Sequence, residues 1–334
     1  MLTHLFNYKI EKSNIAYFPR NKKNKTKLLI LNKKTKKISH KKITDITNII
    51  KQNDLLVLND TKVIPAKLIF KNGKKNIEIL ILKILIKNEA ICYVNLKKNI
   101  THYINLNKKK IKIYHYKNNL FKISIKNYTI NEILNKYGLM PLPPYIKRQQ
   151  EDIDAKTYQT IYSKNQGSIA APTAGLHFYT HLLKKMKNMN IKIDYITLHI
   201  GPGTFESIKK KNINNHKMHF EYIKVSKSLC NNIKKTKKTG NKIIACGTTT
   251  VRALETAALS GKIKPFDGET NIFIKPGFKF NITDSIITNF HLPRSTLLIL
   301  VSAFCDMKTI LKTYECALKH KYKFYSYGDA MLIY

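Results

Sequence analysis

The chain has 334 residues and carries 61 lysines and arginines against 20 aspartates and glutamates, a formal net charge of +41. This length predicts about two domains with a sizeable core. The five cysteines show no C-x-x-C spacing, which argues against a disulfide framework and a structural zinc site. Because no apolar run is long enough to span a bilayer and the N-terminus has no signal pattern, we expect a soluble, cytoplasmic protein without a membrane segment or a metal.

The basic excess favours a polyanionic partner such as nucleic acid. Lysine, isoleucine and asparagine are all abundant, however, which indicates a compositional drift that acts on every surface. The positions of the arginines say more about binding sites than those of the lysines, because lysine cannot replace the planar guanidinium where two parallel hydrogen bonds are needed. Three of the four arginines, Arg148, Arg252 and Arg294, lie in the densest motifs of the chain.

In residues 1–64 we predict a strand over Leu28–Leu31, a helix over Ile43–Ile50 and a buried strand over Asp54–Leu58. The last strand runs into Asn59-Asp60-Thr61. Polar residues directly after an apolar strand stand where α/β folds place binding residues, so Asp60 and Thr61 are candidates. The alternative is an Asx-type turn at a strand end.

Short alternating runs dominate from Lys67 to Ile130, with hairpin turns expected at Asn72-Gly73 and Asn118-Asn119. This texture predicts a small antiparallel β-barrel domain over residues 65–149, inserted into a mixed-sheet α/β domain formed by residues 1–64 and 150–334. The insertion closes with a proline-rich arm that ends in Tyr145-x-x-Arg148. Such an arm suits stacking on a base or gripping a phosphate or carboxylate.

Residues 167–178, GSIAAPTAGLHF, form a loop of small residues that leads into an amphipathic helix over Phe178–Met189. The loop carries Thr173, Gly175 and His177, and it predicts a small-molecule pocket with one imidazole. A tight structural turn around a buried histidine is the alternative.

The α/β pattern continues with a strand over Ile191–Ile200, a helix over Ser226–Lys238 and a strand over Lys242–Ala245. The first strand ends in a loop that lets the backbone pass close to a ligand. The last strand leads to a glycine turn and a threonine-capped helix, whose backbone N–H groups could bind an anion. The candidate residues of this region are His199, Gly201, Gly203, Thr204, His219, Glu221, Gly247, Thr248, Thr249 and Arg252.

Strands over Asn271–Ile274 and Ser285–Asn289 follow, and the second leads to Asn289 and His291 at the sheet edge. Helices are expected from Ser295 through Phe304 and over Thr309–His320. A final turn and an edge strand are expected over Tyr325–Met331.

No single motif is diagnostic of a reaction, since no Ser-His-Asp signature and no His/Cys metal spacing is present. Any one loop histidine is more often structural than catalytic. Four histidines nevertheless occur in glycine- or proline-bearing loops beside strands, together with acidic and basic partners, and this combination favours a polar active cleft. The residues are His177, His199, His219, His291, Asp60, Glu221 and Arg252.

The motifs resemble those of the tRNA ribosyltransferase-isomerases of queuosine biosynthesis. They are NDTKVIPAKL, GLMPLPPYIKR, GSIAAPTAGLHF, LHIGPGTF, MHFEY, GTTTVRALE, TNFHLPRSTL and YSYGDAM. Their order and spacing extend over nearly the whole chain. The sequence departs from the family pattern at Lys62, where arginine is usual, at Glu206, and near Ile15–Arg20.

The resemblance implies an α/β domain with an inserted β-barrel. It also implies a reaction in which the ribosyl part of S-adenosylmethionine, a co-substrate, is transferred and isomerised onto 7-aminomethyl-7-deazaguanine at the wobble position of tRNA. The product is epoxyqueuosine, with adenine and methionine released. We expect a monomer that needs no metal.

The implied chemistry suggests roles for the candidates. A base near the sulfonium would be His177, His219 or Glu221. His291 or His199 would assist adenine departure, and Asp60 or Glu221 would accept hydrogen bonds from the deazaguanine. Arg252 and the amides of residues 247–249 would hold the methionine carboxylate, and Arg148 would contact tRNA phosphates.

Two other classes stay open from the sequence. A methyltransferase acting on tRNA would also use S-adenosylmethionine, although the Rossmann glycine fingerprint that such enzymes often carry is missing. A noncatalytic tRNA-binding protein is the second, and the intact glycines, prolines and arginines of the motifs argue against it.

Overall fold

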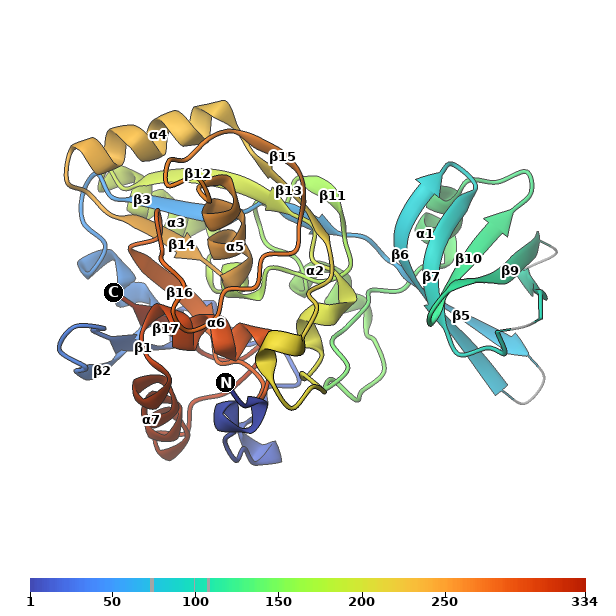
Figure 1. Ribbon diagram of the computed structural model, residues 1–334, viewed down its shortest axis with the longest axis horizontal. Coiled ribbons are helices and arrows are strands. Elements are labelled where there is room, and N and C mark those ends of the chain that lie inside the picture. The colour runs from blue at the N-terminus through green and yellow to red at the C-terminus, as the bar shows by residue number, and fades with distance from the viewer. Residues whose placement is uncertain (73–74, 99, 107–108) are drawn as a thin grey trace.

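The structure is a computed structural model that describes residues 1–72, 75–98, 100–106 and 109–334. Figure 1 shows a larger α/β part and a smaller β part, joined by two extended connections. The predicted turn at Asn118-Asn119 joins two strands as expected, whereas the turn at Asn72-Gly73 lies partly outside the described residues.

The larger part contains β1 (Lys27–Leu31), β2 (Ile38–Lys42), the 3-10 helix η4 (Ile43–Asn48), β3 (Leu55–Asn59), β4 (Thr61–Val63), α2 (Asp152–Thr157), β11 (Asn165–Ser168), η5 (Thr173–His177), α3 (Thr180–Asn188), β12 (Lys192–Leu198), η6 (Pro202–Phe205), β13 (Glu221–Val225), α4 (Lys227–Lys238), β14 (Ile243–Cys246), α5 (Thr248–Ala257), β15 (Phe266–Thr270), β16 (Ser285–Asn289), α6 (Thr296–Phe304), α7 (Met307–Lys319) and β17 (Ala330–Ile333). The smaller part contains β5 (Lys67–Asn72), β6 (Lys75–Ile86), β7 (Glu89–Val94), β8 (His102–Leu106), β9 (Lys109–Lys117), β10 (Leu120–Ile125) and α1 (Ile130–Tyr137). Short 3-10 turns lie at Thr3–Phe6, Lys12–Asn14, Lys23–Lys25 and Ile213–Asn215.

A nine-stranded mixed sheet forms the centre of the larger part, in the order β15-β13-β12-β3-β14-β16-β17-β1-β2. Strands β12, β3, β14 and β16 run parallel, so their carboxyl ends meet at one edge. Ligands bind at this edge in open α/β sheets. The mixed α/β fold predicted from the sequence is confirmed.

Side-chain alternation along the strands sorts the core into two layers. In β3, Leu55 and Val57 join the cluster that also holds the apolar residues of α4, α5, α6 and α7. Leu56 and Leu58 point the other way, into the cluster shared with α3 and η4. Because a strand sends successive side chains to opposite faces, this fully apolar run must be covered on both sides. Burying each such leucine contributes about 1.5–3 kcal/mol.

The smaller part is a six-stranded antiparallel sheet in the order β5-β6-β7-β10-β9-β8. Its two edge strands, β5 and β8, contact each other, so the sheet is nearly closed into a barrel. Ile111 and Ile113 of β9 are fully buried inside, and α1 adds Ile133 and Leu134 to the same cluster. That residues 65–149 form a separate unit with those boundaries stays a prediction.

The helix predicted over Ile43–Ile50 is present as a 3-10 helix over Ile43–Asn48. Three other predictions about elements were wrong. Helix α5 is capped by Gly247, at φ +93°, with no threonine cap. The strand expected over Asn271–Ile274 lies instead at Phe266–Thr270, because its Asp-Gly pair, which looks like a turn, is tolerated where β15 forms the edge of the sheet. The last strand, β17, is internal, since it pairs with both β16 and β1.

Gly138 marks the point where the chain leaves the barrel. A Cβ built there would overlap the backbone carbonyl oxygens of Pro65 and Leu134. We therefore expect Gly138→Ala to lower the free energy of unfolding by about 1–3 kcal/mol, the usual range for overpacking. Denaturant unfolding measures this effect. Gly268→Ala is the control, because its Cβ would meet only ordinary contacts at 3.4 Å and beyond. Equal stabilities of the two variants would contradict the expectation.

Candidate active site

Asn59, the last residue of β3, organises the carboxyl edge of the sheet. Its side chain is fully buried, and its amide group donates to the carbonyl of Leu198 (3.1 Å) and to the hydroxyl of Thr249 (3.2 Å). Its carbonyl oxygen accepts from the backbone N–H groups of Thr61 (3.1 Å) and Leu198 (3.0 Å). One side chain therefore joins β3, β12 and α5. Asn59 was not among the residues predicted for the site, although an amide side chain at the end of an apolar strand was the available signal.

Asp60 and Thr61 connect the start of β4 to strands β11 and β12 and to the loop that follows β12. The Asp60 carboxylate accepts hydrogen bonds from the hydroxyl of Thr197 (2.7 Å) and the side-chain amide of Asn165 (3.0 Å). The Thr61 hydroxyl pairs with Nδ1 of His199 at 2.8 Å. Burial lowers the pKa of His199, and the charge of Asp60 opposes that shift. The His199 ring is therefore fixed by its partner, and it also stacks on Tyr222, with ring centroids 5.3 Å apart.

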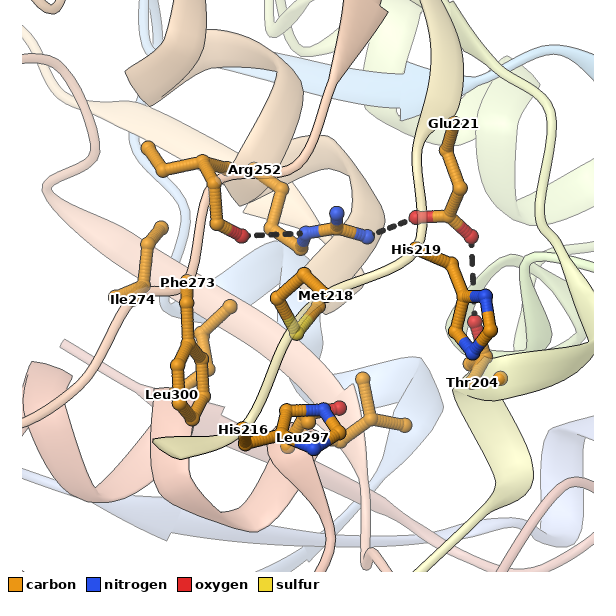
Figure 2. Close-up of a pocket in the computed structure, with 13 residues that line it drawn as sticks. Thr204, His216, Met218, His219, Glu221, Arg252, Phe273, Ile274, Leu297 and Leu300 are labelled. Atoms are coloured by element: carbon orange, nitrogen blue, oxygen red, sulfur yellow. Dashed lines mark hydrogen bonds and ion pairs between the residues drawn. The ribbon is translucent and has the colours of Figure 1, made fainter. Parts of the chain in front are cut away.

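A buried ion pair joins Glu221, at the start of β13, to Arg252 of α5. Figure 2 shows the Arg252 guanidinium directed at the Glu221 carboxylate, and both side chains are 5% exposed. The second carboxylate oxygen accepts from the backbone N–H of Gly201 (2.8 Å) and the hydroxyl of Thr204 (3.4 Å). Arg252 Nε donates to the carbonyl of Ile272 at 3.4 Å. Its Nη2 is buried and finds no partner among the described residues.

His219 lies against the same loop but is exposed to solvent. Its imidazole packs on Gly203, where a Cβ would overlap the ring and displace the His219 side chain. Together with Arg252 and Thr204, His219 lines a cavity of about 20 Å³ (Figure 2). That volume holds about one water molecule. The close approach expected at the Gly201-Pro202-Gly203 turn is thus made to Glu221 and His219.

Asn289, at the end of β16, forms a second polar centre with two buried histidines nearby. Its side-chain amide donates to Nε2 of His177 (3.2 Å) and to the carbonyl of Tyr325 (3.0 Å). Nε2 of His291 pairs with the hydroxyl of Thr288 at 2.8 Å. Burial lowers the pKa of both His177 and His291 to about 3, so both rings are neutral near pH 7.

His177 also reaches a cavity of about 410 Å³ whose lining includes Arg20 and Lys23. The loop that carries it, η5, begins at the half-buried Thr173 and places Gly175 against the Tyr162 ring. The start of α5 lies beside this loop. A Cβ on Gly247 would lie 3.7 Å from that of Ala174, and the buried Thr248 and Thr249 open the helix.

Arg148 lies apart from both centres. Its guanidinium binds Asp154 through two hydrogen bonds of 2.6 and 2.7 Å, and its Nε donates to the carbonyl of Tyr17 at 3.1 Å. Phe18 covers one face, with the guanidinium carbon 4.5 Å from the ring centroid. The fork faces the protein, so a contact with a tRNA phosphate would need the pair with Asp154 to open.

A cleft of about 830 Å³ lies between the two parts of the molecule. The proline-rich arm forms one wall, and Tyr93 and Leu80 of the barrel form another. The loops after β11 and β12 contribute Ala170, Gly201 and Pro202. The lining also includes three lysines from separate segments, Lys67, Lys98 and Lys209.

Comparison with known proteins gives a direct match at the level of family. The model of the queuosine biosynthesis protein family matches residues 3–333. The chain belongs to this family. It is 45% identical over 341 residues to the S-adenosylmethionine:tRNA ribosyltransferase-isomerase of Francisella philomiragia, with 100% of both chains covered. The enzyme of the same name from Hydrogenobaculum is 45% identical over 343 residues, with 98% of each chain covered.

A solved structure of this family supports the fold. The crystal structure of an S-adenosylmethionine tRNA ribosyltransferase from Thermotoga maritima covers 99% of this chain and 100% of its own, at 30% identity and a TM-score of 0.58. The resemblance noted in the sequence motifs is thereby confirmed at the level of family. None of the helices in the described part of this queuosine biosynthesis protein is long and apolar enough to cross a membrane.

The predicted site residues therefore form two groups and one outlier. The group around Asn59 and the Gly201–Thr204 loop contains Asp60, Thr61, His199, Gly201, Gly203, Thr204, His219, Glu221, Thr249 and Arg252. The group around the η5 loop contains Thr173, Gly175, His177, Asn289 and His291, with Gly247 and Thr248 between the two groups. Arg148 is separate. The catalytic and binding roles assigned from the sequence stay predictions.

From the two buried, neutral histidines, His177 and His291, we predict how the stability of the protein depends on pH. Their folded-state pKa of about 3 lies below the ordinary 6.5, so the unfolded chain binds more protons between these values. Stability should be full above pH 6.5 and should fall as the pH drops toward 3, by about 1.4 kcal/mol per pH unit for each histidine.

Urea unfolding at several pH values measures this slope. We expect His177→Gln to reduce the proton uptake on unfolding by about one between pH 6 and 4. His181→Gln, at an exposed position on α3, is the matched control. An unchanged slope in His177→Gln would show that the His177 ring is not held neutral in the folded state.

Proposed function

We propose that this chain transfers and isomerises the ribosyl part of S-adenosylmethionine onto 7-aminomethyl-7-deazaguanine at the wobble position of tRNA. Epoxyqueuosine forms, and adenine and methionine leave. The observation that carries this proposal is the full-length similarity to enzymes named for that activity. The motif loops converging on the carboxyl edge of the sheet support it. The expectations of a monomer and of a reaction without a metal stay predictions.

The cleft between the two parts is our candidate for substrate entry, and it meets the cavity lined by His219 and Arg252 at the Gly201–Thr204 loop. Its volume of about 830 Å³ lies within the range of small-molecule pockets. The cavity beside Arg252, at about 20 Å³, is too small for the co-substrate in this conformation. The unpartnered Nη2 of Arg252 nevertheless supports a role in binding a carboxylate, provided that the Gly201–Thr204 loop moves outward.

His219 is the histidine that we assign as the base. Its ring is exposed and stands on the Gly203 turn, whereas His177 and His291 are buried and already hydrogen-bonded. Glu221 is occupied by Arg252 and the Gly201 amide, so it acts as a positioning residue. Proton removal from the carbon next to the sulfonium by a positioned base contributes about 10²–10⁴-fold to such reactions.

The test combines the purified protein, S-adenosylmethionine and tRNA that already carries the aminomethyl-deazaguanine. Mass analysis of the tRNA and of the small molecules should show the ribosyl-derived gain together with free adenine and methionine. We expect His219→Gln to lower kcat by about 10²–10⁴-fold. His216→Gln is the matched control, because His216 lines the same cavity and should keep its turnover.

Other outcomes would decide against the proposal. A methyl-sized gain with S-adenosylhomocysteine would identify a methyltransferase. Binding of tRNA without any product from folded protein would identify a noncatalytic binding protein. Full turnover in His219→Gln would remove His219 as the base and leave the activity itself intact.

We further propose that the outer face of the barrel contacts the tRNA. Cross-strand register places alternate residues of β8, β9 and β10 on this side, opposite the buried isoleucines. We define the Lys–Tyr face by Tyr103, Lys110, Lys112, Tyr114, Tyr116 and Lys122. Lysine ammonium groups lie 4.5–5.5 Å from the tyrosine ring centroids. Lysines neutralise phosphates and tyrosine rings stack on bases, which makes this face suited to RNA.

Replacing Lys110, Lys112 and Lys122 together with glutamine should weaken tRNA binding and flatten its salt dependence. Three lost phosphate contacts at about 0.7 each reduce the slope of log K against log salt by about 2. Fluorescence titration at several salt concentrations measures this slope. The control removes the same charge from Lys234, Lys235 and Lys238, which are exposed on α4 in the larger part. Equal losses in both triple variants would show that only net charge matters.

A further inference from the structure

Strand β2 and helix α7 bring three metal-binding side chains together outside the proposed reaction site. They are His40, Cys316 and His320, and one ligand atom of each lies within 4.8 Å of the others. Within the described ranges, no other group of three or more histidine, cysteine or acidic side chains meets this criterion. Figure 1 shows β2 and α7 close together, away from the barrel.

The local structure explains why these groups converge. Cys316 and His320 are four residues apart at the end of α7, and this spacing puts both on one face of the helix. His40 comes from β2, an edge strand of the large sheet, and it is 276 residues away from Cys316. No motif of closely spaced cysteines and histidines could therefore have revealed the group.

The distances match those between the ligands of a tetrahedral metal. The Cys316 sulfur lies 3.9 Å from Nε2 of His40 and 3.6 Å from Nδ1 of His320. With a metal–sulfur bond near 2.3 Å and a metal–nitrogen bond near 2.05 Å, tetrahedral geometry separates sulfur and nitrogen by about 3.6 Å. The two imidazole rings are stacked, with centroids 4.1 Å apart, so the His320 ring must turn before both nitrogens can face one metal.

A buried tyrosine orients one of the ligands. Tyr322 is 1% exposed, and its hydroxyl pairs with Nδ1 of His40 at 2.9 Å. That hydrogen bond leaves Nε2 of His40 directed toward Cys316, as outer partners do for histidines that bind metals. His320 now hydrogen-bonds the Cys316 carbonyl through Nδ1 at 2.9 Å, and it must give up that bond to bind a metal. Its ring is exposed at the end of the helix and has space to turn.

We propose that His40, Cys316 and His320 form a binding site for a borderline-soft divalent cation, Zn²⁺ foremost, with water as the fourth ligand. One thiolate and two imidazoles select zinc-like ions, whereas Mg²⁺ and Ca²⁺ prefer oxygen ligands. The ion joins the edge strand β2 to α7. Lys27, whose ammonium group donates to the His320 carbonyl at 2.9 Å, opposes the added positive charge and limits the affinity.

The test is titration of the full-length reduced protein with Co²⁺, which reports its own coordination. One equivalent should produce the visible spectrum of a tetrahedral site and a sulfur-to-cobalt charge-transfer band, and Zn²⁺ should abolish both. Cys316→Ser should lose the charge-transfer band. Cys305→Ser is the matched control, because Cys305 is also partly exposed but lies next to Lys36 and Asp306 instead.

A second measurement needs no variant. Zn²⁺ should slow alkylation of Cys316 at least tenfold and leave Cys305 unchanged, as read by peptide mass analysis. Absence of a charge-transfer band, its persistence in Cys316→Ser, or equal alkylation of Cys316 with and without Zn²⁺ would each overturn the proposal.

Discussion

The fully buried amide of Asn59 is the constraint on which the carboxyl edge of the sheet depends. Its four hydrogen bonds fix the end of β12, the first residue of β4 and the first turn of α5 relative to one another. Leaving one of these buried donors or acceptors without a partner would lower the free energy of unfolding by about 1–3 kcal/mol. The native fold therefore keeps all four hydrogen bonds. The His199 loop and the Arg252 helix are positioned through this single side chain.

Buried carboxylates explain where arginine persists in a chain dominated by lysine. Three arginines pair with acids whose side chains are at most 5% exposed. The pairs are Arg20 with Asp329, Arg148 with Asp154, and Arg252 with Glu221. Most lysine pairs involve exposed acids, as in Lys83 with Glu269, where the carboxylate is 48% exposed. A guanidinium presents several fixed donors and is less strongly hydrated than an ammonium, so lysine cannot replace it at a buried acid.

This pattern also changes the interpretation of the arginines. The sequence pointed to ligand binding at the densest motifs, but in the structure three of the four arginines neutralise acids within the protein. Arg294 lies in a loop at φ +55°, with its backbone hydrogen-bonded to Phe6 and Ile208. Among the described arginines, only Arg252 combines an internal ion pair with a buried donor that has no partner among the described residues. These ion pairs therefore hold the segments that carry the motifs in place.

The sequence by itself determined the family, the mixed α/β class and most helices and strands, because those follow from local patterns. Apolar runs such as Leu55–Leu58 and the alternation in β9 specify which faces are buried before any contact is known. The tertiary structure alone decided which loop residues meet. It showed that His219 is exposed while His177 and His291 are buried, that β17 is internal, and that His40 reaches Cys316 from the far end of the chain. Such contacts depend on the order of strands in the sheet and on which polar groups become buried. Neither can be inferred from the spacing of residues along the chain.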